Sequence, residues 1–336
     1  MNTELYRASE HIQSSGTARD VDWRKLLYAS ATQPPDSATL ARGLQRGLLI
    51  AAALLGGSGL IFWIAANWQE LSRVARLALI EGSLLVMLVA ACFLPRAREA
   101  CLVGAFLALG GLLAFIGQTY QTGADAWQLF AAWAALSLPW VLGTRSDLLW
   151  TPWVAVAALA LSLWTGPLGL MSWFDSTEPH GLELMVTFLA WLVLGLLPLA
   201  VAHITWLRLP GGLGRWSHRL ALGLALSAWA GLGLARLFMS ESISASMSFA
   251  WLLAAGLVMG VMWMSLRSRW RDLPTLALAL LAANVLVMGL AVRLVFANDT
   301  DIGGLLVLGL LGLVCLGLSA TWLMRQQQAW ADGAMA

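Results

Sequence analysis

Charged residues are scarce in this sequence of 336 residues, because Asp, Glu, Lys and Arg together make up only 11% of it. About 25% is usual in soluble proteins, so the scarcity argues against a water-soluble globular fold. It also argues against a disordered chain, which needs high charge and low hydrophobicity. Apolar residues make up 60% of the sequence, and 32 glycines come in addition. At about 20 apolar residues per membrane-spanning helix, roughly ten spans are predicted.

Cysteines and catalytic motifs are also few. The three cysteines, Cys92, Cys101 and Cys315, lie in or beside apolar runs without a CxxC spacing, which argues against a disulfide framework or a zinc site. The sequence has no GxSxG, no HExxH, no phosphate loop and no stretch of five basic residues. We therefore expect no metal, no cofactor, no nucleic-acid partner and no enzymatic activity.

Long apolar runs dominate the sequence and predict an all-α, polytopic membrane protein with about ten transmembrane helices. The predicted spans are Gly47–Ala66, Ala75–Leu94, Ala100–Ile116, Trp127–Leu142, Leu148–Leu168, Leu182–Trp206, Leu220–Phe238, Ser248–Ser265, Leu273–Phe296 and Ile302–Leu323. Residues 1–46 are polar, so we expect a short helical segment there and no cleavable signal peptide. Pro139 and Pro152 leave open whether the fourth and fifth spans are full-length, kinked or re-entrant.

The Lys and Arg residues predict the orientation of these spans. If the N-terminus is cytoplasmic and there are ten spans, 16 of the 20 basic residues fall in cytoplasmic segments. This bias agrees with the positive-inside rule. It predicts that both termini, including the tail 325–336, are cytoplasmic.

Two polar segments at the predicted outer ends of spans suggest a family. The first is Asn67-Trp68-Gln69-Glu70, and the second is Gly117-Gln118-Thr119-Tyr120-Gln121, shortly before Trp127. Together they resemble the bacterial predicted membrane proteins called domain of unknown function 2157. The resemblance covers about residues 1–145, and thus the four-span region 47–145 but not the six spans within 146–324. It implies a bacterial inner-membrane location and a membrane-anchored partner protein encoded in the same operon. It implies no activity.

Glu81 is the most unusual polar residue, since it lies inside the second predicted span. An ionisable residue at the centre of a span costs about 2.5–3.5 kcal/mol on insertion scales, so its presence needs a reason. We predict a polar pocket in the outer half of the membrane, formed by Glu81, Asn67, Gln118 and Tyr120. The alternative is a structural ion pair between Glu81 and Arg293 or Arg236. A further buried polar residue, Asn284, is predicted to bond to a neighbouring helix.

Two functions are open at this stage. A pocket around Glu81 would suit a small-molecule transporter, in which the carboxyl group carries a proton or holds a cationic substrate. The alternative is a scaffold or accessory protein without transport activity, which docks a periplasmic or membrane-anchored partner. A polar cavity lined by Glu81 and Asn284 would favour transport, whereas a solid apolar bundle would favour docking.

Overall fold

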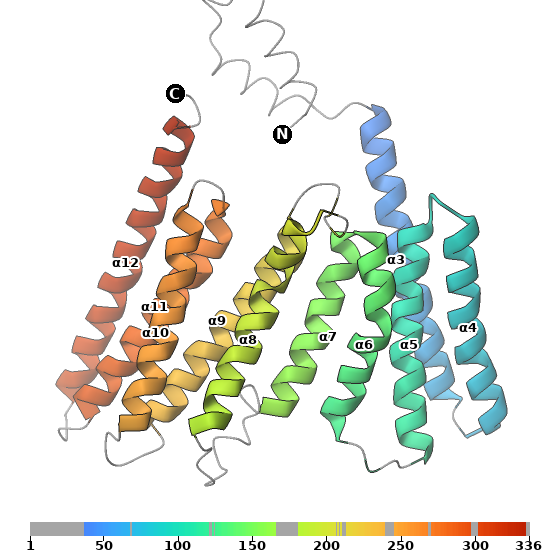
Figure 1. Cartoon of the computed structure of the whole chain (residues 1–336), viewed down its shortest axis with the longest axis horizontal. Coiled ribbons are helices and arrows are strands. Elements are labelled where there is room, and N and C mark those ends of the chain that lie inside the picture. Colours follow the sequence, from blue (N-terminus) through green and yellow to red (C-terminus); the bar gives the residue numbers. More distant parts are fainter. Residues whose placement is uncertain are drawn as a thin grey trace, which may run out of the picture. The chain divides into compact units, whose positions relative to one another are not determined.

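The computed structural model describes residues 37–333, apart from 68, 121, 122, 124, 166–180, 206, 208, 210–212, 239–244, 268, 269 and 297–301. Ten helices lie in this part of the chain (Figure 1). They are α3 (Ser37–Ala66), α4 (Arg73–Phe93), α5 (Arg98–Tyr120), α6 (Ala126–Thr144), α7 (Asp147–Thr165), α8 (Gly181–His203), α9 (Arg215–Phe238), α10 (Ala245–Leu266), α11 (Leu273–Phe296) and α12 (Ile302–Gly333). The predicted helical segment before residue 37 lies outside the described residues.

All ten described helices are long and apolar enough to cross a membrane, which confirms the predicted number of spans and the all-α fold class. The fourth and fifth spans, α6 and α7, are continuous helices of 19 residues each, with Pro139 and Pro152 inside them. At 1.5 Å per residue each is about 28 Å long, close to the thickness of the hydrocarbon core. Neither proline therefore breaks its helix into a re-entrant segment.

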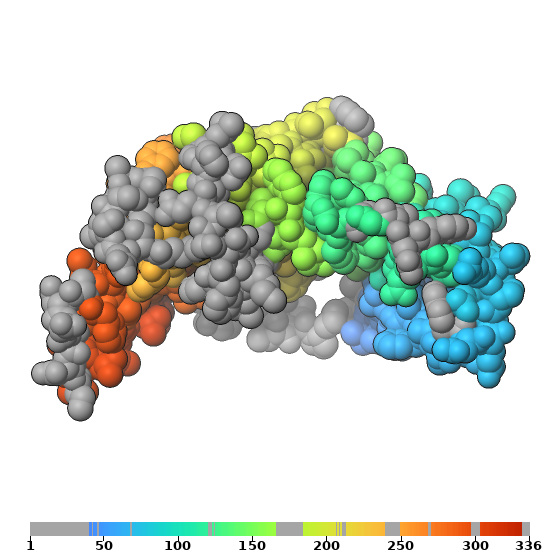
Figure 2. All heavy atoms as spheres, turned by 90° about the horizontal axis from the view of Figure 1, so that it is seen from below, coloured from blue at the N-terminus to red at the C-terminus, as the bar shows by residue number. Residues whose placement is uncertain are grey.

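The chain divides into two units, Met1–Ala51 and Ala52–Ala336. In the second unit, helices that are neighbours in sequence are mostly neighbours in space, so the colours change gradually across Figures 1 and 2. The helix α9 has the most neighbours, because it packs against α7, α8, α10 and α11. Its sequence explains this position: Ala221, Ala225 and Ala228 are small and fully or almost fully buried, so other helices can approach closely.

Tryptophan indoles connect several of these helices. Each donates its ring N–H to a backbone carbonyl of the adjacent helix, where a hydrogen bond replaces one that water cannot supply in a bilayer. The pairs are Trp133 with Phe106, Trp153 with Ala134, Trp229 with Phe188 and Trp251 with Leu286, at 2.8–3.3 Å. Trp133 and Trp229 thus pack on neighbouring helices.

The helices α3, α4 and α5 meet in a smaller apolar cluster. Ile64, Ile80 and Phe115, one from each helix, are buried together. By contrast, only 6% of the residues in the most apolar stretch of α3, and likewise of α12, are buried. In α4 the share is 11%. The helices α3 and α12 therefore present most of their apolar side chains outward, and α4 presents one exposed apolar face. A bilayer or another protein would cover these surfaces.

Candidate functional site

Glu81 lies on an exposed face of α4, eight residues and thus about 12 Å from the start of the helix. Its neighbours on that face follow at helical spacing and are apolar: Val74, Leu85 and Val89 are 76%, 61% and 54% exposed. We call Val74, Ala78, Glu81, Leu85 and Val89 the α4 stripe. One carboxyl group therefore stands in the middle of an outward apolar surface.

The structure provides no partner for this carboxyl group among the described residues, where Glu81 has neither a hydrogen bond nor an ion pair. In particular, it is paired with neither Arg236 nor Arg293. Those arginines lie on α9 and α11, whereas the helix that packs extensively against α4 is α5. An ion pair between these elements would require helices that do not pack together.

The other residues of the predicted pocket do not converge on Glu81 either. The Asn67 amide donates to the carbonyl of Trp63 at 2.8 Å, so it closes the last turn of α3. Gln118 is exposed on α5 and bonds to neither Asn67 nor Glu81. The side chain of Tyr120 lies outside the described residues. Asn67 therefore has a structural task in ending a helix, which the sequence alone did not indicate.

A cavity does lie between α3, α4 and α5, but it is apolar. Its volume is about 50 Å³, far below the roughly 300–1,000 Å³ of typical ligand pockets. Neither Glu81 nor Asn284 lines it. The lining residues are Gly56, Gly57, Leu60, Ile61, Ile64, Ile80, Ser83, Met87, Gly104, Ala108 and Gly111. The hydroxyl of Ser83 donates to the carbonyl of Ile80 at 2.8 Å, so this polar group is already satisfied.

Asn284 bonds to a neighbouring helix, which confirms the prediction for this residue. Its amide nitrogen donates to the Ser319 hydroxyl of α12 at 3.0 Å, and that hydroxyl lies 3.3 Å from the amide oxygen. Since α12 is otherwise little buried, this pair is a specific polar tie between α11 and α12. Both the amide nitrogen and the amide oxygen of Asn284 thus interact with Ser319.

Replacing Asn284 with leucine is expected to weaken this tie only modestly. Hydrogen bonds between membrane helices contribute about 0.6 kcal/mol on average, so we expect a loss of about that size in unfolding free energy. A double-mutant cycle with Ser319→Ala, measured by denaturant titration in detergent, isolates the pair. A coupling near zero would contradict the assignment, and Ser227→Ala, whose hydroxyl bonds only within its own helix, serves as control.

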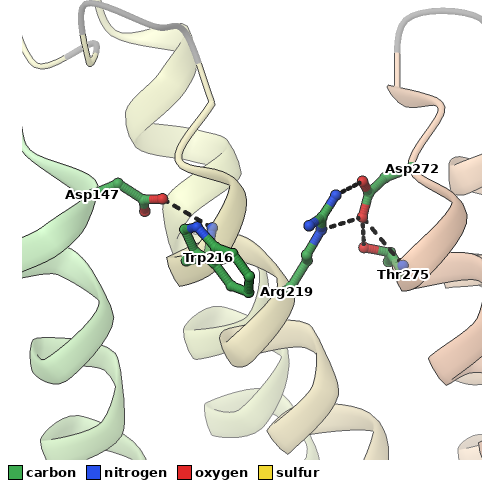
Figure 3. Close-up of polar contacts among 5 residues, drawn as sticks. All are labelled: Asp147, Trp216, Arg219, Asp272 and Thr275. Atoms are coloured by element: carbon green, nitrogen blue, oxygen red, sulfur yellow. Dashed lines mark hydrogen bonds and ion pairs between the residues drawn. The ribbon is translucent and has the colours of Figure 1, made fainter. Parts of the chain in front are cut away.

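Polar side chains come together where α7, α9 and α11 begin, and Figure 3 shows several of them. Asp147, the first residue of α7, accepts the backbone N–H groups of Trp216 and Ser217 at 2.9 and 3.1 Å. It also accepts the Ser217 hydroxyl at 2.6 Å. Asp147 thus caps the N-terminus of α9 from another helix, where free N–H groups and the helix dipole favour a negative charge.

A second carboxylate joins α9 to α11. The Arg219 guanidinium donates to both carboxylate oxygens of Asp272, with Nε–Oδ2 and Nη2–Oδ1 distances of 3.1 and 2.7 Å (Figure 3). Asp272 also accepts the N–H and the hydroxyl of Thr275 at 3.2 and 2.6 Å, so it caps α11. Burial alone would raise the pKa of Asp272, but the bonds from Arg219 and Thr275 outweigh it and lower that pKa.

Gly214 permits this arrangement. A Cβ atom at residue 214 would lie 2.6 Å from the Ser217 hydroxyl and would overlap the Asp147 carboxylate. We call Asp147, Ser217, Arg219, Asp272 and Thr275 the three-helix clamp. It satisfies the polar ends of two helices and fixes α9 between α7 and α11. Its chemistry is that of a structural support, since Asp147 accepts three hydrogen bonds and Asp272 four from protein donors.

Sequence reasoning missed the clamp. Asp147 and Asp272 each stand directly beside the first leucine of a predicted span, which is a position typical of a helix cap. That signal, together with the alternation of spans, places both carboxylates and Arg219 on one side of the membrane. It does not show that Asp147 caps α9 rather than its own helix, because that depends on which helices pack together.

No group of three or more His, Cys, Asp or Glu that could hold a metal ion occurs in the part of the chain that the structure describes. The described residues define a multi-span helical membrane protein in which some polar side chains join helices to one another and others bond within their own helix.

Comparison with known proteins agrees with this class. Residues 24–150 match the family model described as Predicted membrane protein (DUF2157), which confirms the resemblance given by the Asn67 and Gly117–Gln121 segments. The match covers the helices α3–α6 and the beginning of α7. No curated protein and no solved structure matches the chain.

Proposed function

We propose that this protein is a non-catalytic scaffold or accessory protein of the membrane, which docks a membrane-anchored partner on the α4 stripe. The observation that carries the proposal is the outward position of Glu81. An ionisable side chain that faces hydrocarbon is costly, whereas the same side chain in a contact between helices can find a hydrogen-bonding partner.

The partner that fits the α4 stripe is a transmembrane helix with a lysine or arginine at the depth of Glu81. Apolar side chains above and below the carboxyl group suit helix packing in lipid, and a basic group would pair with the carboxylate. A second copy of this chain fits less well, since a symmetric contact at Glu81 would bring two carboxylates together. A membrane-anchored partner also agrees with what the family resemblance implies.

A transport function has less support. The cavity between α3, α4 and α5 is apolar and holds about 50 Å³, too little for a metabolite. Asn284 is bonded to Ser319, and the three-helix clamp uses its own carboxylates. Asn284 and the clamp carboxylates are thus engaged by other protein groups, and Glu81 is directed away from the bundle.

For the location, we propose the cytoplasmic membrane of a bacterium with both termini in the cytoplasm. The distribution of Lys and Arg supports this orientation. Reporter fusions at the C-terminus test it: a cytoplasmic reporter should be active there and a periplasmic one inactive, and the opposite result would overturn the orientation.

The docking proposal is tested with a synthetic helix as probe. The protein and a fluorescent, single-span oligoleucine peptide with one lysine about 12 Å from its end are reconstituted together in vesicles. Association is measured as energy transfer between the protein and the peptide, and it is compared with the value for an all-leucine peptide. We expect the lysine peptide to associate about tenfold more strongly, and Glu81→Gln to remove most of this preference because a neutral amide lacks the charge attraction.

Glu70→Gln is the matched control, since Glu70 is an exposed acid in the turn between α3 and α4 and should leave the preference unchanged. Equal association of the two peptides with the unaltered protein would overturn the proposed partner chemistry. Substrate uptake into vesicles that depends on Glu81 would overturn the scaffold function itself.

A further inference from the structure

Two arginines near the end of α10 lie over tryptophan rings, and within the described part of the chain their guanidinium N–H groups make no hydrogen bond. The Arg267 guanidinium carbon lies 3.9 Å from the centre of the Trp263 ring, and that of Arg271 lies 5.8 Å from the centre of the Trp330 ring. Both arginines are exposed, and Trp263 is 61% exposed. Within the described residues neither guanidinium has a carboxylate partner.

Arg219 shows the contrast. Its guanidinium carbon also lies over a tryptophan ring, 5.9 Å from the centre of the Trp216 ring, but its Nε and Nη2 groups donate to Asp272. Its charge is thus neutralised inside the protein. Arg267 and Arg271 keep their charge and their donors available at the end of the helices, where the membrane meets water and indole rings are preferred.

From this geometry we infer that Arg267 and Arg271 bind the phosphate groups of anionic phospholipids. A guanidinium offers a planar pair of N–H donors that matches a phosphate in a bidentate way. Stacking on Trp263 and Trp330 holds each plane before a lipid arrives, so less side-chain freedom is lost on binding. Trp263 lies one turn before the end of α10 and Trp330 lies in the last turn of α12, so the glycerol and acyl chains of the lipid would run along the exposed apolar faces of these two helices.

The site is independent of the docking proposal, because it lies on α10, α12 and the connection to α11 rather than on α4. It also differs in chemistry, since it recognises an anion through fixed cations. A basic residue near an anionic membrane surface contributes about 1 kcal/mol, which corresponds to a factor of about five in binding. We therefore expect a several-fold preference for anionic over zwitterionic lipid.

The experiment uses the full chain, purified and reconstituted in nanodiscs of phosphatidylglycerol and phosphatidylcholine in equal amounts. Native mass spectrometry then counts the lipids that stay bound. We expect phosphatidylglycerol to be enriched about fivefold or more on the unaltered protein. The double variant Arg267→Gln/Arg271→Gln should bring the enrichment close to one, and Trp263→Leu should reduce it while leaving the charges in place.

The control is Arg96→Gln/Arg98→Gln, which removes the same charge where α4 connects to α5. Both arginines are exposed, and neither lies over an aromatic ring of the described residues. It should keep the enrichment. An equal loss in this control, or an enrichment that survives Arg267→Gln/Arg271→Gln, would overturn the site. So would equal protection of the delipidated protein by soluble glycerophosphate, because the ligand would then not be a lipid. Melting temperatures in phosphatidylcholine alone should be unchanged in all variants, which separates lost binding from lost folding.

Discussion

Replacing Asp272 with alanine is expected to lower the free energy of unfolding by about 2–3 kcal/mol. The change removes two bonds from Arg219 and two from Thr275. It also leaves a guanidinium without a counter-charge at a site where its side chain is only 26% exposed. A hydrogen bond to a charged group contributes about 1.5–3 kcal/mol, and partial exposure reduces the total below that of a fully buried pair.

Asp147→Ala should cost a similar amount, because it removes the cap from the N-terminus of α9. Both variants can be compared with the unaltered protein by chemical unfolding in detergent. The matched control is Asp125→Ala. Asp125 occupies the cap position before α6 but makes no side-chain bond to the helix, so its removal should cost less than about 0.5 kcal/mol. A cost at Asp125 equal to that at Asp272 would show that the clamp has no special role.

The stability lost in Asp272→Ala is expected to depend on pH. Since the pKa of Asp272 is lower in the folded protein than its usual 3.8, the folded state holds the ionised form more strongly than the unfolded state does. The contribution of Asp272 is therefore complete at pH values above about 4–5 and is lost as the pH falls through its lowered pKa. The stability difference between the unaltered protein and Asp272→Ala should narrow below pH 4 and stay constant between pH 6 and 8.

Gly110→Ala is expected to destabilise the contact between α5 and α6 by about 2–3 kcal/mol. An alanine Cβ at this position would overlap the Trp133 ring. That ring cannot easily move, because its N–H donates to the carbonyl of Phe106 at 2.9 Å. In addition, the centres of the Trp133 and Phe106 rings lie 5.0 Å apart, with the rings tilted. Overpacking in a well-filled interior typically costs about 1–3 kcal/mol, and here the loss of the indole hydrogen bond is added.

The adjacent Gly111 supplies a control on the same helix. A Cβ there would meet the Ile61 side chain at 3.6 Å, which is ordinary contact, so Gly111→Ala should be tolerated or slightly stabilising. The two variants are compared by their melting temperatures and their tryptophan fluorescence in detergent. If Gly110→Ala and Gly111→Ala behave alike, the fit of Trp133 against Gly110 is not a determinant of the fold.

Much of the fold could be predicted from the sequence, because in a membrane the length of an apolar run directly determines a span. The predicted second span, Ala75–Leu94, and ninth span, Leu273–Phe296, agree with α4 and α11 to within two residues. Asn284 could be assigned a role for the same reason, since an amide inside a span needs a partner. The family resemblance was visible because its residues are contiguous in sequence.

The proposed pocket was less predictable, because it required knowledge of which way each helix faces. Placing Glu81, Asn67 and Gln118 at similar depths is possible from residue counting, but a rotation of α4 decides whether Glu81 points inward or outward. The apolar runs do not encode that rotation, since apolar residues surround Glu81 on every side of α4.

The scarcity of charge, the apolar runs and the distribution of Lys and Arg determined by themselves that this is a membrane protein with ten spans, and they predict its orientation. Only the tertiary structure decided that Asp147 caps α9, that Asp272 pairs with Arg219, and that Glu81 faces out of the bundle. The physical reason is that span formation depends on local hydrophobicity, whereas these contacts depend on which distant helices pack together and on how each helix is rotated about its axis.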